Sequence, residues 1–400
     1  MKSRTLGPMV LAVVLVMVTA ACRREAPPRE EEPAKPVYKI VFMGDLTGPA
    51  KSLCIGPRNA VGMAVEEANA KGDLAVKLSF SGEDTQGDPN RALPIGKRVA
   101  ADNEVIAVVG PCFSGESFST GPDLEAAAIP RVTPSATNPG LSQQGWTHWF
   151  RGVGNDSSQG GPTPEIILGL LKARKVYIGH DKSAYGEGLA TIVRDGMKRA
   201  NPAALVGFEG VDPGREDYSP LVSNVVASRA DAFYWGAYEK EAGLIVKQLR
   251  ERGFKGSFVA ADGSKGSDFL KVGAAAAEGA VLTCPCADPN TSQDAEAKAF
   301  GAAYKEKFGE EPTIYAGEGY DAATILIEAI RKAGKPAAGV RAYREAVTGN
   351  VAATSGLKGV TKAYRFQASG ELVSEAVEIY LYRVKGGKYV LEGTAADLLK

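Results

Sequence analysis

Histidine is nearly absent from this sequence, and its scarcity restricts the chemistry that the chain can perform. Only His148 and His180 occur among the 400 residues. A histidine-ligated metal, or a Ser-His or Cys-His nucleophile, would have to use one of them. His148 stands between Trp146 and Trp149, and His180 ends a predicted strand, and both positions are typical of structural histidines. We therefore expect neither a metal site nor a histidine-based active site.

The common enzyme motifs are missing as well. The sequence has no Walker phosphate loop, no G-x-G-x-x-G, no G-x-S-x-G and no H-E-x-x-H. These motifs would cradle nucleotide phosphates, bind a dinucleotide, expose a nucleophilic serine or hold zinc. We therefore expect no cofactor and no catalytic residue, and turnover of an amide substrate is the observation that would revive an enzyme.

An excess of charge of either sign is also lacking. Lys and Arg total 47, and Asp and Glu total 47. Such a chain has no net positive field to attract nucleic acid. Nucleic acid is not an expected partner.

The longest strongly apolar run lies near the N-terminus, over residues 9–18. It is shorter than the roughly 20 residues that a membrane-spanning helix needs. Lys2 and Arg4 precede the run, and small residues follow it as far as Ala21. This arrangement predicts a secretory signal peptide over residues 1–21.

Cys22 follows directly, and the stretch around it resembles a lipobox, which implies a diacylglycerol anchor on this thiol. Residues 22–36 mix charge with proline, have little to bury, and are interpreted as a disordered tether. We expect the mature protein outside the cytoplasm, in the periplasm or at the cell surface, and held to a membrane by lipid.

From residue 37 onward, short strands rich in Val and Ile alternate with helical runs, which is typical of a parallel sheet with helices on both faces. The pattern restarts near Val176, after a Gly- and Ser-rich connection over residues 152–162. The last third supplies helices first and strands last, so we expect it to complete both units. The predicted lobes are residues 37–154 plus 284–364, and residues 155–283 plus 365–400.

Polar loops follow two strands of the first unit. Ser114 and Gly115 stand where a helix should begin after "VIAVVG", and Ser135, Ala136 and Thr137 form a nearby turn in "TPSATNPG". Open α/β sheets bind ligands at the carboxyl ends of strands, and a helix start favours an anion. These loops therefore suggest a carboxylate site, although each alone is also explained by a cap or a turn.

Three segments together carry a family resemblance: "GPCFSGES…IPRVTPSATNPGL", "HDKSAYGEGLA" and "DAFYWGAYEKEAG". They resemble the leucine/isoleucine/valine-binding proteins, the branched-chain group of type I periplasmic binding proteins. The resemblance implies two similar doubly wound α/β lobes, joined by three crossovers, which close like a hinge on a ligand. It further implies a monomer that delivers an amino acid to an ABC permease and its ATPase.

The resemblance also assigns roles to individual residues. Ser114 and Thr137 match residues that bind the ligand carboxylate, and the backbone carbonyl of Ser135 would meet the ammonium. Asp262 matches the carboxylate that pairs with the ammonium, although it is one methylene shorter than the Glu usual there. The remaining expected ligand-binding residues are Ala136 of the same turn and three pocket aromatics: Tyr185, Tyr238 and Tyr315.

One departure leaves the ligand open. The first loop lacks the aromatic that family members usually place against the ligand side chain, and it offers Leu53, Cys54 or Ile55 instead. A small branched-chain or similar amino acid is the leading ligand. The alternatives are a binding protein for an amide, a urea or an aromatic acid, and a ligand-sensing module.

The cysteines beyond Cys22 are Cys54, Cys112, Cys284 and Cys286, which allow three disulfide connectivities. The resemblance implies a disulfide with one partner near Cys112, and Cys54 is free to replace the missing second partner. Cys284 and Cys286 would then form a C-x-C pair that is either bridged or reduced.

Overall fold

The computed structural model describes residue 1, residues 35–336 and residues 339–400. The predicted signal peptide, Cys22 and nearly all of the predicted tether lie outside the described residues. Residues Lys35–Lys400 form one unit. None of the helices in the described part of the chain is both long and apolar enough to cross a bilayer.

A five-stranded, fully parallel sheet forms the first lobe, in the order β2-β1-β3-β4-β5. Its strands are β1 (Val37–Gly44), β2 (Lys77–Asp84), β3 (Val105–Val109), β4 (Arg131–Thr133) and β5 (Trp149–Arg151). Every residue of β3 is buried, as expected for a strand covered by helices on both faces. Its helices are α1 (Ser52–Lys71), α2 (Pro89–Ala101), α3 (Ser114–Ala126), α10 (Ala295–Phe308), α11 (Ala316–Ala333) and α12 (Val340–Ala352).

A seven-stranded sheet forms the second lobe, in the order β14-β13-β10-β9-β8-β6-β7. The strands are β6 (Val176–His180), β7 (Leu205–Gly210), β8 (Ala232–Gly236), β9 (Ser257–Ala260), β10 (Val281–Cys284), β13 (Tyr380–Lys385) and β14 (Lys388–Thr394). Their helices are α6 (Gly186–Ala200), α7 (Ser219–Ala227), α8 (Glu239–Glu251) and α9 (Ser267–Gly273). The remaining α-helices of the described residues are the short α4 (Asp156–Gly160), α5 (Thr163–Glu165) and α13 (Ala395–Leu398), and β11 (Ser355–Lys358) and β12 (Ala363–Arg365) form a small hairpin.

One edge of the second sheet is antiparallel, which differs from the expected parallel layout. β13 pairs antiparallel with both β10 and β14. Gly386 and Gly387 join β13 to β14 and have φ angles of 58° and 69°. Two consecutive left-handed residues are what a tight hairpin turn requires, so this connection closes a hairpin instead of a crossover.

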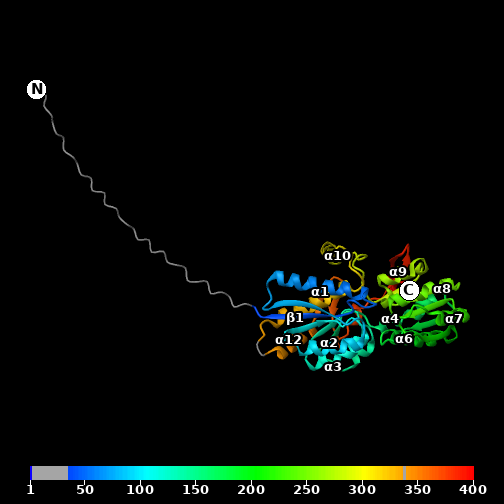
Figure 1. The fold of residues 1–400 in the computed structure, drawn as a ribbon, viewed down its shortest axis with the longest axis horizontal. Coiled ribbons are helices and arrows are strands. Elements are labelled where there is room, and N and C mark those ends of the chain that lie inside the picture. The colour runs from blue at the N-terminus through cyan, green and yellow to red at the C-terminus, as the bar shows by residue number, and fades with distance from the viewer. Residues whose placement is uncertain (2–34, 337–338) are drawn as a thin grey trace. The chain divides into compact units, whose positions relative to one another are not determined.

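The chain passes between the lobes three times, and Figure 1 shows the outcome: blue, cyan and orange segments build one lobe and green segments the other. The passages follow β5, β10 and β12. α11 packs on α1 in the first lobe, while β13 and β14 join the second sheet. The last third of the chain therefore contributes to both sheets.

The helix ends follow from their capping residues. Asp88 caps α2 by accepting from the Asn90 N–H, with Pro89 at the first helical position, and Asp294 caps α10 in the same way. Helix α1 begins at Ser52 and contains Pro57 in its second turn, where the proline has no N–H to donate to the carbonyl four residues earlier.

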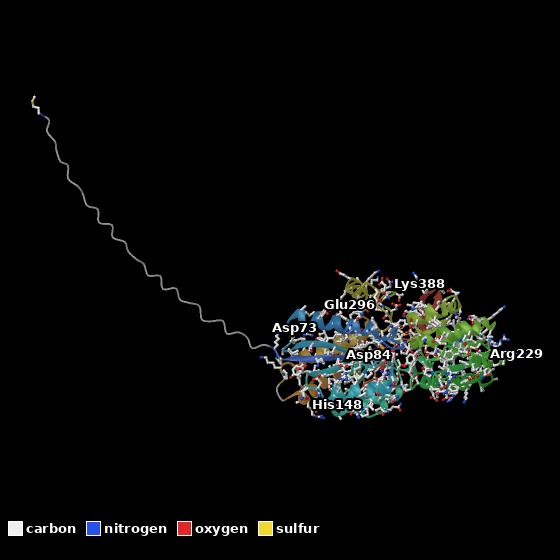
Figure 2. The ribbon with its side chains drawn as sticks, viewed as in Figure 1. Asp73, Asp84, His148, Arg229, Glu296 and Lys388 are labelled. Atoms are coloured by element: carbon white, nitrogen blue, oxygen red, sulfur yellow. A yellow bond between two sulfur atoms is a disulfide. The ribbon has the colours of Figure 1, made fainter. Side chains whose placement is uncertain are left out.

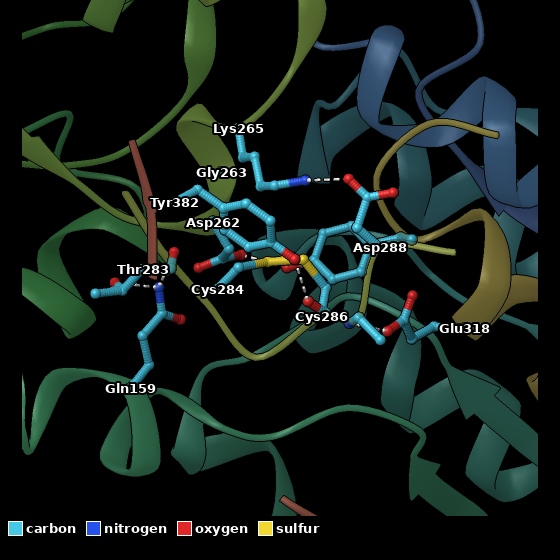
Figure 3. The surroundings of a disulfide bond; sticks show 12 residues. Gln159, Asp262, Gly263, Lys265, Thr283, Cys284, Cys286, Asp288, Glu318 and Tyr382 are labelled. Atoms are coloured by element: carbon cyan, nitrogen blue, oxygen red, sulfur yellow. Dashed lines mark hydrogen bonds and ion pairs between the residues drawn. A yellow bond between two sulfur atoms is a disulfide. The ribbon is translucent and has the colours of Figure 1, made fainter. Parts of the chain in front are cut away.

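The disulfide differs from the expected one. Cys284 and Cys286 are bonded, with Cα atoms 5.1 Å apart (Figure 3), whereas Cys54 and Cys112 are free and buried. The expected Cys54–Cys112 bridge is thus wrong for this structure. Burial raises the pKa of the Cys54 thiol well above its usual range, and the neighbouring Cys112 thiol adds to the effect. Disulfide exchange needs a thiolate, which this environment disfavours.

Candidate functional site

The carboxyl ends of strands from both lobes converge on one small cavity. Phe113 and Ser114 follow β3, Ser135 follows β4, and loops after β6, β8 and β9 supply the second-lobe side. This is the edge at which open α/β sheets bind ligands. The lining residues are Leu53, Phe113, Ser114, Ser135, Tyr185, Tyr238, Asp262, Gly263 and Tyr315.

Six of the residues expected to bind ligand line this cavity: Ser114, Ser135, Tyr185, Tyr238, Asp262 and Tyr315. Ala136 and Thr137 do not. The Ala136 carbonyl accepts from the buried Arg151 guanidinium at 2.5 Å, and the Asn138 carbonyl accepts from it at 2.9 Å. Because Arg151 is itself paired with Glu371, the guanidinium fixes this turn from behind the cavity wall.

The first-lobe wall is built around the start of α3. Ser114 is the first residue of this helix, and its Oγ accepts from the Asn138 N–H at 3.2 Å, which joins the two predicted loops. The N–H groups of the first helical turn have no partner within the helix and favour a negative charge. Glu116 already accepts from the Phe113 N–H. The Ser114 end of the cavity is therefore suited to a carboxylate.

Asp262 occupies the second-lobe wall and is only 3% exposed. Its two carboxylate oxygens accept from the Tyr185 hydroxyl, at 2.8 Å, and from the Tyr315 hydroxyl. Burial raises the pKa of Asp262, while the tyrosine hydrogen bonds oppose that shift. An acid held in this way is suited to a cationic group that enters the cavity.

Tyr315 reaches Asp262 from the first lobe. It caps the start of α11 in a left-handed conformation, with φ of 63° and ψ of 0°. A bulky residue adopts this conformation at an energetic cost, and such residues concentrate at ligand sites. The Tyr315–Asp262 hydrogen bond therefore joins the two lobes at the cavity.

Asp156 is a buried acid that sequence reasoning missed. It is fully buried behind the cavity, and within the described chain neither carboxylate oxygen has a well-formed hydrogen bond. Burial raises its pKa well above the usual range, and the charge of Asp262 acts in the same direction. The nearby Thr137 hydroxyl lowers this pKa but is itself unsatisfied in the described chain. Unsatisfied buried polar groups are costly, so they mark this region as a place for a polar partner.

The position of Asp156 explains why it was missed. It opens the short helix α4, where Asn155 supplies the cap, inside the Gly- and Ser-rich stretch interpreted as a flexible connection. Gln159, one turn later, donates to the carbonyl and hydroxyl of Thr283 at the second passage between the lobes (Figure 3). The sequence signal that could have identified this helix is the helix-capping Asn155 directly before Asp156, within a stretch that was interpreted as a linker.

Aromatic and aliphatic side chains form the rest of the wall. The ring centroids of Phe113 and Tyr238 are 4.9 Å apart, and those of Tyr185 and Tyr238 are 5.2 Å apart. Leu53 is the residue of the first loop that reaches the cavity. Phe113 was not predicted, and its place directly before Ser114 was the available signal. No Lys, Arg or His belongs to the described lining.

The two histidines lie elsewhere. His148 lies on the first lobe (Figure 2), where its Nδ1 pairs with Glu125 at 2.8 Å, and His180 packs against Phe208. Among residues 35–336 and 339–400, no group of three His, Cys, Asp or Glu side chains is arranged to hold a metal ion.

A cavity between two α/β lobes, with a helix start on one side and a hydrogen-bonded acid on the other, defines a two-lobed binding protein. The family model described as "Periplasmic binding protein" matches residues 37–388. The chain belongs to this family, whose members are substrate-binding proteins and not enzymes.

Relatives and a solved structure show similarity to the branched-chain amino acid-binding proteins within this family. The Leu/Ile/Val-binding protein BraC3 of Rhizobium johnstonii is 30% identical over 352 residues, which cover 88% of this chain and 92% of that protein. The leucine-, isoleucine-, valine-, threonine- and alanine-binding protein of Pseudomonas aeruginosa is 31% identical over 76% of this chain and 80% of its own length. The crystal structure of the leucine-binding protein LivK of Thermotoga maritima is 25% identical, with a TM-score of 0.81 over 89% of this chain and 98% of that one.

Proposed function

We propose that the protein captures a small amino acid, branched-chain or similar, between its lobes and delivers it to an ABC importer. The observation that carries this proposal is Asp262, a buried acid bonded to Tyr185 and Tyr315, in a cavity whose described lining has no cationic side chain. A zwitterion would meet the α3 start with its carboxylate and Asp262 with its ammonium. The names of the similar proteins point to the same ligand class.

The proposed roles divide the ligand between the lobes. Ser114 and the first N–H groups of α3 bind the carboxylate, and the carbonyl of Ser135 assists at the ammonium. Asp262 pairs with the ammonium, and Asp156 supports it from behind. Because the two charges are met from opposite lobes, a buried zwitterion is satisfied only when the lobes close.

The cavity is nearly closed in this structure, because it leaves only about 10 Å³ for the centres of water-sized molecules, whereas common ligand pockets enclose about 300–1,000 Å³. A ligand therefore requires the two lobes to separate. Leu53, Phe113 and Tyr238 provide an apolar surface for a short aliphatic group. An amide, a urea or an aromatic acid remains the alternative ligand.

The accompanying features are part of the same proposal. The lobes are residues 37–154 plus 284–364 and residues 155–283 plus 365–400, and the protein is a monomer. A signal peptide over residues 1–21 directs it out of the cytoplasm, and lipid on Cys22 holds it at the membrane through the tether.

The test combines mass spectrometry of ligand released from the purified protein with a thermal-shift screen of all amino acids, simple amides, urea and aromatic acids. A ligand at 100 times its dissociation constant stabilises the protein by about 2.7 kcal/mol, which is a readily measured shift. Stabilisation by branched-chain or other small amino acids supports the proposal. Stabilisation by an amide or an aromatic acid alone would replace it with the alternative.

A further inference from the structure

A side-chain hydrogen bond joins the lobes just outside the cavity. Ser52, the first residue of α1, donates its hydroxyl to Glu239, the first residue of α8. Their sequence neighbours, Leu53 and Tyr238, line the cavity. The contact therefore lies beside the ligand space without belonging to its wall.

The surroundings of Glu239 position its carboxylate for the hydrogen bond with Ser52. Its side chain is fully buried, and its second oxygen accepts from the Asp268 N–H at 2.8 Å. Burial raises the pKa of Glu239 to about 7, and the hydrogen bond from Ser52 opposes the shift. A buried carboxylate is costly unless hydrogen bonds satisfy it. Ser52 therefore supplies one of the two bonds that make burial of Glu239 tolerable.

The neighbouring backbone leaves room for the bond. A Cβ placed on Gly266 would collide with the Glu239 carboxylate and would lie 2.7 Å from the Ser52 Oγ. The φ angle of Gly266 is −91°, so glycine is needed here for space and not for conformation. The Tyr389 hydroxyl donates to the Gly266 carbonyl at 2.8 Å and fixes this backbone in place.

We propose that the Ser52–Glu239 hydrogen bond is a latch that sets how long the closed, ligand-bound state lasts. The proposal rests on the proposed function, because the ligand is taken to close the lobes. Both residues are positioning residues, since neither lines the cavity. A contact that forms only on closure acts on the dissociation rate more than on the association rate.

The kinetic test uses stopped-flow measurement of L-leucine, L-isoleucine and L-valine binding to the full-length protein. Ser52→Ala should raise koff about 10-fold, equivalent to about 1.4 kcal/mol, and change kon by less than about two-fold. Gly266→Ala should raise koff in the same direction, because it obstructs the latch from the other side. The melting temperature of the ligand-free Ser52→Ala variant should match that of the wild type.

Ser228→Ala is the matched control. This serine is also half-buried, and its hydroxyl donates to the Val225 carbonyl within its own lobe. Its koff should equal the wild-type value. A koff for Ser52→Ala no higher than that of this control overturns the latch.

A second measurement separates failure of the latch from failure of the proposed function. Spin labels at Lys97→Cys and Lys198→Cys, exposed on α2 and α6, report the distance between lobes in ligand-free protein. Ser52→Ala should reduce the closed fraction, and an unchanged distribution would count against the latch. If the wild type binds none of the amino acids, the proposed function fails. The distance distribution of the ligand-free protein then tests the latch by itself.

Discussion

Replacing Asp262 with Asn tests the proposed ammonium site with little disturbance of the fold. Asn has the same shape, and its carbonyl can accept from Tyr185 while its amide donates to a turned Tyr315 hydroxyl. The carboxylate form of Asp262 is already opposed by burial, which raises its pKa. Removing this charge should therefore leave the melting temperature of the ligand-free protein unchanged or slightly higher.

Binding should respond very differently. The ligand ammonium would remain buried without its carboxylate, and removing one partner of a buried charge pair costs about 3–5 kcal/mol. At about 1.4 kcal/mol per decade, the affinity should fall by roughly two to three and a half decades. Isothermal titration with the ligand from the screen measures this loss directly.

The matched control is Asp181→Asn. Asp181 is a second buried acid of the same lobe, with a pKa raised to about 6 by burial, but it does not line the cavity. Its replacement should change the affinity by less than about three-fold, or roughly 0.7 kcal/mol. Unchanged affinity in Asp262→Asn would refute the ammonium assignment. An equal loss in both variants would show that charge anywhere in the lobe, and not this contact, controls binding.

Three further predictions concern the carboxylate end, the pH dependence and the anchor. Ser114→Ala should weaken ligand binding by less than Asp262→Asn in the same titration, because the backbone N–H groups of the α3 start still hold the carboxylate; a larger loss would assign the carboxylate to the hydroxyl itself. Burial raises the pKa of Glu116 from 4.5 to about 7. The protonated side chain therefore contributes to the stability of the folded state below pH 4.5, and this contribution is lost as the pH rises through 7. The total loss of stability is on the order of 3 kcal/mol. Chemical unfolding of Glu116→Gln from about pH 5 to about pH 8 should show a smaller loss of stability than in the wild type, and equal losses would contradict the assignment. Cys22→Ser should release the mature protein from the membrane fraction, and a wild-type protein found soluble after fractionation would show that the lipid anchor is wrong.

Much of the fold could be predicted because it depends on local patterns. Buried strands such as β3 and β8 are runs of apolar residues, and helices such as α8 and α10 begin where the sequence places polar residues before an apolar stripe. The antiparallel edge at β13 and β14 was missed because its direction is set by the Gly386–Gly387 turn, a signal of two residues.

The cavity was predictable for a related reason. Ser114, Tyr185, Tyr238 and Asp262 each follow a strand, and the carboxyl ends of parallel strands meet at one edge of a sheet. Their positions along the chain therefore already placed them together. The hydrogen bond from Tyr185 to Asp262, which spans 77 residues, is the consequence.

The sequence by itself determined the two α/β lobes, the family and the strand ends that carry the site. The tertiary structure alone decided that Thr137 lies behind the wall, that Asp156 is buried, that Cys284 bonds to Cys286, and that Ser52 meets Glu239 across 187 residues. Apart from the local disulfide, these arrangements arise where segments distant in the sequence pack against each other. Residue identity and spacing encode the segments, but the packing of one lobe on the other selects which of their side chains meet.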